Sequence, residues 1–255
     1  MIRIRPAEWD GLRLRLPEEV PGPAVMCTHV QTTGLGRCWV DRLLAPRAVA
    51  VRCGGHTLLM GDPSAVPRGR LADLIRGQVA APARFLPRLM AEVGRVRPWE
   101  RMVYAHRFAA PPTSPPPGFQ VRSLVAADAA RLIHLGPEAA WIAETWGGPV
   151  GLAASGHARG AVTNGALAAV ACVYFHGRRH AELAVVTAPW ARRLALARAC
   201  VTALCADVRA EGRVPTWTAA RDNTASRRLA WTCGFRLVCE TTHYSVEARP
   251  ARTAA

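Results

Sequence analysis

Hydrophobic and polar positions follow a clear pattern in the second half of the chain. Ala181–Thr187 is a run of strand-favouring residues that Pro189 ends, because proline cannot donate a ladder hydrogen bond. From Leu194 the apolar residues recur every three or four positions as far as Val208, and Gly212 follows where a helix would end. The pattern predicts a strand followed by a long helix with one buried face.

Similar patterns surround this strand and helix. Further strands are predicted at Phe119–Leu124, Ala158–Thr163, Leu167–Phe175, Val214–Ala219 and from Phe235 to Glu240. Helices are predicted at Ala127–Leu135, Pro137–Glu144 and from an Asp222 or Asn223 cap through Trp231. Asn164-Gly165 is a strong hairpin signal between two of the strands. The predicted order is β-α-α-β-β-β-α-β-α-β-β.

The first half also predicts mixed α/β structure. Its strands are predicted at Val25–Val30, Arg37–Asp41, Ala48–Cys53 and Thr57–Met60. Its helices are predicted at Leu71–Val79 and Pro82–Val93. We find no cofactor-binding loop in this half.

A proline-rich stretch separates the two halves. Residues 109–118 hold five prolines, which favour an extended spacer. At 255 residues the chain is long for one core, so two domains are expected. We predict an N-terminal domain at 1–108, a linker at 109–118, a second domain at 119–248 and a disordered tail at 249–255.

Two arginines mark the start of the long predicted helix. Arg192 and Arg193 lie where the first N–H groups of the helix have no intrahelical partner. Two positive charges there oppose the helix dipole unless an anion is bound. The segment is therefore predicted to bind an anion such as a phosphate group.

These residues resemble the acetyl-CoA core of the GNAT (GCN5-related) N-acetyltransferases. The family has an Arg/Gln-x-x-Gly-x-Gly/Ala loop whose amides hold the CoA pyrophosphate, and the frame from Arg192 to Ala197 matches it. Asn223-Thr224-Ala225-Ser226 and Gly234-Phe235 extend the resemblance, which covers about 118–247. Ala195 departs from the family's central glycine. The helical period predicts helical φ at Ala195, where alanine costs no strain.

The resemblance implies a fold and a set of cofactor-binding residues. It implies an α/β (α+β) protein whose second domain has a mixed, mostly antiparallel sheet with flanking helices, and whose smaller first domain can be a degenerate copy of the same fold. The fourth and fifth strands of the GNAT sheet are splayed so that the pantetheine arm enters between them. The implied acetyl-CoA contacts are Val185, Val186, Thr187, Arg192, Arg193, Leu194, Ala195, Leu196, Ala197, Asn223 and Ser226.

The resemblance also implies a reaction, acetyl transfer from acetyl-CoA to a primary amine by direct attack. Glu182 is the candidate base, although an edge or solvent-face glutamate explains it equally well. A strand bulge near Val185 or Val186 would free an N–H for the oxyanion. Ala230 stands where the family has its proton-donating tyrosine. The alternative function is therefore a non-catalytic CoA-binding or regulatory module.

Composition limits the other classes of partner. The net charge is +15, all 33 basic residues are arginine, and the charge is spread evenly along the chain. This composition is typical of a GC-rich bacterial genome and argues against a nucleic-acid partner. No apolar window approaches the roughly 18 residues of a membrane span, so a cytoplasmic protein is expected. The expected partners are acetyl-CoA and an amine-bearing small molecule or peptide whose identity the sequence does not give, in a monomer or homodimer.

The cysteines and histidines show no pattern of metal ligands, so no metal site is predicted, and two tryptophans are left with alternative roles. The eight cysteines form no C-x-x-C pair and are expected to be buried free thiols. His176 and His180 flank a turn and are expected to be exposed, and Gly177 argues against their pairing on a helix. Trp141 and Trp146 either line an acceptor pocket or pack in the core.

Overall fold

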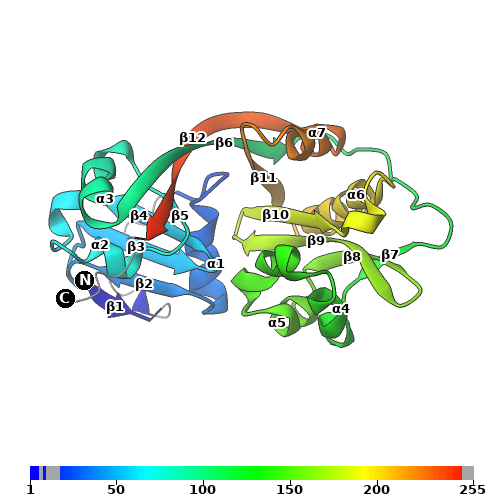
Figure 1. The fold of residues 1–255 in the computed structure, drawn as a ribbon, viewed down its shortest axis with the longest axis horizontal. Helices are drawn as coiled ribbons and strands as arrows, with labels where there is room; N and C mark the ends of the chain where they lie inside the picture. The colour runs from blue at the N-terminus through cyan, green and yellow to red at the C-terminus, as the bar shows by residue number, and fades with distance from the viewer. Residues whose placement is uncertain (6–7, 10–17, 249–255) are drawn as a thin grey trace, which may run out of the picture. The chain divides into compact units, whose positions relative to one another are not determined.

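The computed structural model describes residues 1–5, 8–9 and 18–248, so the tail predicted at 249–255 lies outside the described residues. The chain forms two compact units (Figure 1). Among the described residues, unit 1 comprises 1–5, 8–9, 30–101 and 241–248, and unit 2 comprises 18–29 and 102–240. Each unit therefore takes segments from both halves of the sequence, whereas the predicted domains meet at the proline-rich linker.

The sheet of unit 2 joins a parallel pair of strands to an antiparallel run. Its strands in chain order are β7 (Gln120–Ser123), β8 (Ala158–Thr163), β9 (Ala166–His176), β10 (His180–Thr187) and β11 (Val214–Ala220). β7, β8, β9 and β10 pair antiparallel, and β10 pairs parallel with β11. The predicted hairpin turn is present, because Asn164 and Gly165 both have left-handed φ, 46° and 77°.

Helices cover both faces of this sheet. They are η5 (Ala126–Asp128), α4 (Ala129–Ile133), η6 (Pro137–Trp146), α5 (Pro149–Ala154), η7 (Pro189–Ala191), α6 (Leu196–Ala210) and α7 (Thr224–Thr232). α6 packs on β8 to β11, and η6 packs on β9 and β10. Every residue of β9 from Leu167 to Phe175 is buried, which requires a covered face on each side because successive side chains point oppositely.

The sheet of unit 1 repeats this connectivity. Its strands are β1 (Ile2–Ile4), β2 (Arg37–Val40), β3 (Ala48–Cys53), β4 (His56–Gly61) and β5 (Gln78–Ala80). The first four pair antiparallel, and β4 pairs parallel with β5. Between β4 and β5 lie only η3 (Pro63–Ala65) and the four-residue α2 (Leu71–Leu74), whereas the 15-residue α6 joins β10 to β11 in unit 2. η4 (Ala83–Phe85) and α3 (Leu86–Glu92) complete a core around Phe85 and Leu89.

Two long strands pass from one unit to the other. β6 (Gly94–His106) begins in unit 1, and its last residues, Met102–His106, lie next to β11 in unit 2. β12 (Phe235–Ala248) begins in unit 2, and its residues His243–Ser245 pair antiparallel with β5 in unit 1. The sheet of each unit therefore includes the end of a strand that begins in the other unit.

Three expectations about local structure are wrong. Val25–Val30 belongs to a helix, α1 (Val25–Thr33), because a short apolar run does not distinguish a buried helix from a strand. The helix predicted at Leu71–Val79 ends at Leu74. The two strands expected after Gly234 are one 14-residue strand, β12.

Candidate functional site

β10 and β11 are paired over three residues and diverge beyond them. The parallel ladder joins His180–Glu182 to Val214–Thr216, although β10 continues to Thr187 and β11 continues to Ala220. On its other side β10 stays paired with β9 as far as Thr187. The structure therefore contains the predicted splay, which leaves one side of residues 183–187 without a partner from β11.

A main-chain N–H group of β10 lacks a strand partner among the described residues because β10 and β11 diverge, and not because of a bulge. N–H groups of successive residues point to opposite sides of a strand. The Ala188 N–H donates to the Ala168 carbonyl of β9 at 2.8 Å. The Val186 N–H therefore also points toward β9, and the Val185 N–H points toward the side left open by β11. The register shift of β10 lies between Glu182 and Leu183. The bulge predicted near Val185 or Val186 is therefore wrong in position.

The segment between β10 and α6 turns through two left-handed residues. Arg193 has φ 65°, and Ala195 has φ 58° and ψ 10°. Arg192, just before them, is extended with φ −68° and ψ 154°. The helix predicted to open on Arg192 and Arg193 instead begins after them, at Leu196. The helical φ predicted for Ala195 is also wrong.

This turn presents main-chain N–H groups at the start of α6. Ala199 donates the first helical hydrogen bond, to the carbonyl of Ala195 at 3.0 Å. The N–H groups of Leu196, Ala197 and Arg198 therefore precede the helical ladder. Left-handed residues in a turn orient successive N–H groups into a concave cluster that binds anions. The positive end of the 15-residue α6 dipole adds to the same effect.

The side chains of this turn face solvent. Arg192, Arg193, Leu194 and Ala195 are all exposed. Within the described part of the chain, neither Arg192 nor Arg193 has a guanidinium hydrogen bond or an ion pair. Two unpaired positive charges therefore stand beside the N–H groups that begin α6.

Asn223 and Ser226 are held by contacts within unit 2. Asn223 is the N-cap of α7, and its Oδ1 accepts a hydrogen bond from the Ser226 N–H at 3.0 Å. The Ser226 hydroxyl in turn accepts from Trp217 Nε1 at 3.0 Å, which ties α7 to β11. The predicted cap is confirmed. The side-chain oxygens of both residues are engaged in holding the start of α7.

Glu182 lies at the point where β10 and β11 diverge. Its side chain is only 7% exposed, and it accepts a hydrogen bond of 2.5 Å from Thr216 Oγ1 on β11. The interpretation of Glu182 as a solvent-face residue is therefore wrong. Thr216 was not predicted as a site residue, because the parallel pairing that places it opposite Glu182 joins residues 34 positions apart.

A tyrosine from β6 contacts α7. The Tyr104 hydroxyl accepts a hydrogen bond from Arg227 Nε at 3.2 Å. Arg227 and Ala230 are three residues apart on α7 and share one face of the helix. The phenol therefore contacts a residue that lies one helical turn from Ala230. This contact could not be predicted, since the two residues are 123 positions apart.

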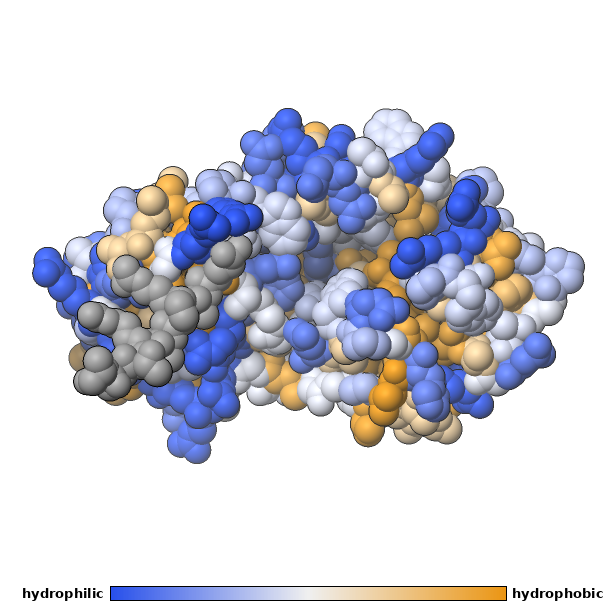
Figure 2. All heavy atoms as spheres, viewed as in Figure 1, coloured by the Kyte–Doolittle hydropathy of each residue, from blue (hydrophilic) through white to orange (hydrophobic). Residues whose placement is uncertain are grey.

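The singled-out tryptophans have different environments. The indole N–H of Trp146 donates to the Val173 carbonyl at 2.7 Å, so Trp146 is held against β9. Trp141 is 41% exposed and packs its edge on Tyr174. With Ile133 on α4 and Val150 on α5 it contributes exposed hydrophobic side chains, and Figure 2 shows hydrophobic surface over this part of unit 2.

The turn histidines are not exposed as expected. The side chains of His176 and His180 are only 18% and 16% exposed. His180 lies near Glu19, with Nδ1 3.5 Å from a carboxylate oxygen. Glu19 also accepts hydrogen bonds from the N–H groups of Arg178, Arg179 and His180 and so fixes the turn between β9 and β10.

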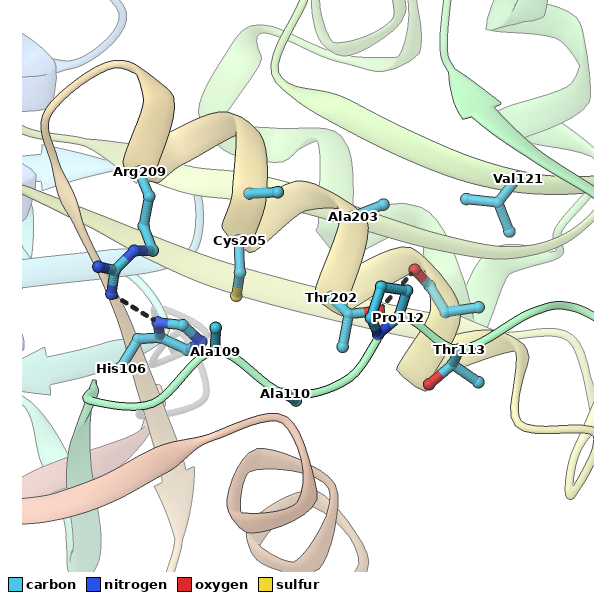
Figure 3. Close-up of a pocket in the computed structure, with 12 residues that line it drawn as sticks. His106, Ala109, Ala110, Pro112, Thr113, Val121, Thr202, Ala203, Cys205 and Arg209 are labelled. Carbon is cyan, nitrogen blue, oxygen red and sulfur yellow. Dashed lines mark hydrogen bonds between the residues drawn. The ribbon is translucent and has the colours of Figure 1, made fainter.

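A separate cavity of about 530 Å³ lies along α6 (Figure 3). The linker segment Ala109–Thr113 forms one wall, and α6 residues from Ala199 to Arg209 form the other. At one end an Arg209 guanidinium nitrogen and His106 Nδ1 are 3.4 Å apart. The cavity does not include the turn at Arg192–Ala195, so the two features are distinct.

Comparisons with known proteins identify the family. Residues 112–244 match the model of the GNAT acetyltransferase family. An uncharacterized N-acetyltransferase from Streptomyces virginiae is 53% identical over 211 residues, which are 82% of this chain and 89% of that protein. The chain therefore belongs to the GNAT N-acetyltransferases.

Solved structures share the fold at low sequence identity. A GCN5-related N-acetyltransferase-like protein from Streptococcus suis has a TM-score of 0.70 and 17% identity, over 95% of this chain and 98% of its own. A tandem GNAT protein from the clavulanic acid biosynthesis pathway has a TM-score of 0.56 and 17% identity, over 97% and 96%. The expected α/β fold, with a mixed sheet and flanking helices, is confirmed.

Two remaining expectations concern the thiols and membrane spans. All eight cysteines are free; seven are buried as expected, but Cys239 is exposed. Among the described residues, no helix has the length and apolar character needed to cross a bilayer.

Proposed function

We propose that unit 2 transfers an acetyl group from acetyl-CoA to a primary amine of a small molecule or peptide. The observation that carries the proposal is the turn before α6, where N–H groups and two unpaired arginines meet. Such an arrangement suits a pyrophosphate. Leu196 and Ala197 would supply N–H groups to it. The thioester arm would lie in the opening between β10 and β11, along Val185, Val186 and Thr187.

Residues at the splay can support direct attack on the thioester. A neutral amine nitrogen forms a bond to the carbonyl carbon, and the Val185 N–H donates to the oxygen as it becomes negative. Glu182 takes the proton that the amine loses, and Thr216 holds the carboxylate in place. The carbon–sulfur bond then breaks, which gives an amide and the CoA thiolate.

Tyr104 is our candidate for returning a proton to the sulfur. Its hydroxyl is held by Arg227 beside the face of α7 that carries Ala230. Replacement by phenylalanine should lower kcat and leave the dissociation constant for CoA unchanged. An unchanged kcat would assign the proton to water.

The phosphate assignment is tested by Arg192→Glu. A carboxylate among the phosphates should weaken CoA binding at least about 10-fold, on the scale of a charge-assisted hydrogen bond of ~1.5–3 kcal/mol. Arg68→Glu is the matched control, because Arg68 is an exposed arginine of unit 1 and the change in net charge is the same. Isothermal titration should show a loss of affinity for Arg192→Glu alone. Equal affinities for the two variants would refute the phosphate-binding turn.

A non-catalytic CoA-binding module is the second candidate. Ala230 is fully buried at the position of the GNAT tyrosine, so that helix face carries no proton donor of its own. The two candidates differ in turnover with a panel of amines. Glu182→Gln should abolish any turnover near neutral pH and spare CoA binding if Glu182 is the base. Tight CoA binding without turnover in the wild type would favour the regulatory module.

A further inference from the structure

Two histidines and a glutamate converge on the edge of unit 2 away from the splay. His157 precedes β8, His176 ends β9, and Glu211 follows α6. One ligand atom from each lies within 4.8 Å of the others. His157 Nδ1 is 3.8 Å from Glu211 Oε1, and His176 Nε2 is 3.9 Å from Glu211 Oε2. None of the three was predicted as a metal ligand, because they lie in or beside three separate elements of the fold.

The polar atoms of this cluster are incompletely satisfied. His176 Nε2 is buried and has no hydrogen-bond partner among the described residues. The two imidazole rings stack with centroids 4.5 Å apart, so neither ring donates to the other. A buried ring nitrogen without a partner is destabilising, because it has lost its hydrogen bond to water. A bound ion would supply the missing partner.

The end of α6 also favours a cation at this cluster. Glu211 is the C-cap of the 15-residue α6, where the helix dipole is negative.

The cluster would contract around a bound ion. Two ligands at about 2.0–2.1 Å from a tetrahedral Zn²⁺ lie about 3.3 Å apart. The two Glu211 contacts, at 3.8 and 3.9 Å, exceed this by roughly half an ångström, and the three ligand atoms lie within 4.8 Å of one another, so the imidazole rings would move inward together with the partly exposed Glu211. We propose that His157, His176 and Glu211 form a site for a divalent transition metal of the Zn²⁺ type, with one position left open.

The second coordination layer is also present. The backbone N–H of His176 donates to His29 Nδ1 at 3.0 Å, and His29 Nε2 lies 2.9 Å from the Thr145 carbonyl, which fixes this end of β9. Arg213 forms an ion pair with Glu211 and donates to the Gly177 carbonyl at 2.9 Å. Its guanidinium holds the carboxylate in place but also repels a cation. The site should therefore bind more weakly than one without the arginine.

Titration of chelator-treated full-length protein, free of any histidine tag, with ZnCl₂ tests the site. We expect one Zn²⁺ per chain, and Co²⁺ should give the visible absorption of a tetrahedral complex. His157→Ala and Glu211→Gln should each weaken binding at least about 10-fold, the effect of losing one ligand. Arg213→Gln should tighten it, since a neighbouring positive charge is removed.

Two controls separate this site from adventitious binding. His134 is an exposed histidine, and Cys239 is the exposed cysteine. His134→Ala and Cys239→Ser should leave the affinity unchanged. Glu211→Gln alters a partly exposed side chain, so it keeps the test decisive even if His157→Ala fails to fold. Stoichiometric binding that survives Glu211→Gln, binding that depends on Cys239, or no binding at all would each overturn the proposal.

Discussion

Ala195→Gly is the most direct test of the turn that precedes α6. Ala195 has φ 58° and ψ 10°, a left-handed conformation in which the methyl group of alanine crowds the backbone. Glycine adopts the same conformation without that crowding. The GNAT loop usually has glycine here, and this chain keeps the glycine-type conformation with an alanine in it.

The magnitude follows from two opposing terms. Left-handed φ costs a non-glycine residue about 1–2 kcal/mol, and glycine removes that cost. Glycine also has more freedom in the unfolded chain, which costs about 0.4–1 kcal/mol. The difference predicts a variant more stable by about 0.5–1 kcal/mol. For a unit of this size that raises Tm by roughly 1–4 °C.

Ala206→Gly is the matched control, because Ala206 is exposed in the interior of α6. That change should lower stability by about 1 kcal/mol through backbone entropy. Differential scanning calorimetry should therefore give shifts in Tm of opposite sign for the two glycine variants. A loss of stability for Ala195→Gly, equal to that of Ala206→Gly, would refute the left-handed turn.

CoA titration adds an independent result. Because the turn already has the conformation that glycine would allow, Ala195→Gly should change the dissociation constant by less than about 3-fold. A tenfold gain in affinity would mean that the methyl group blocks the phosphate. That result would favour the non-catalytic module.

Three further predictions concern stability. Asp128 is fully buried, and the hydrogen-bonded Arg122 guanidinium holds the pKa of its carboxyl far below the usual range. Asp128→Asn should lower the free energy of unfolding by about 1.5–3 kcal/mol at pH 7. Denaturant unfolding should show that the wild type alone loses this stability as pH falls below about 4. Burial lowers the pKa of His243 to about 3, so its neutral form stabilises unit 1 above pH 6.5 and that stability is lost progressively toward pH 3. His243→Leu should flatten the dependence of unfolding free energy on pH in this range, and an unchanged dependence would contradict the assignment. A chain starting at residue 117 lacks Met102–His106, the part of β6 beside β11 in the sheet. Because the sheet of unit 2 is then incomplete, thermal unfolding followed by circular dichroism should show no cooperative transition. A sharp transition would mean that unit 2 folds without β6.

Most strands of unit 2 could be predicted because their signals are local. The alternation in β7 and β8, the Asn164-Gly165 turn and the Asn223 cap each act within a few residues. The turn before α6, which we propose binds an anion, was singled out through Arg192 and Arg193 for the same reason. Its conformation was wrong, because the helical period extends back to Leu194 although the helix does not.

Contacts between residues far apart in the sequence could not be predicted from local patterns. Thr216 reaches Glu182 only because two parallel strands pair over three residues. Tyr104 reaches Arg227 only because β6 enters unit 2. α1 was predicted as a strand, since six consecutive buried positions have no period to distinguish the two structures.

The repeated connectivity of the two units explains why we propose the CoA site for unit 2. Both units place a helical connection between a pair of parallel strands, the position at which a helix start can hold an anion. In unit 1 that connection holds the four-residue α2, whose Arg70 cap is right-handed, so it offers neither a long dipole nor a left-handed turn. In unit 2 the 15-residue α6 follows two left-handed residues. Helix length and the turn before it, more than the sheet, therefore distinguish unit 2, where we propose the binding site, from unit 1.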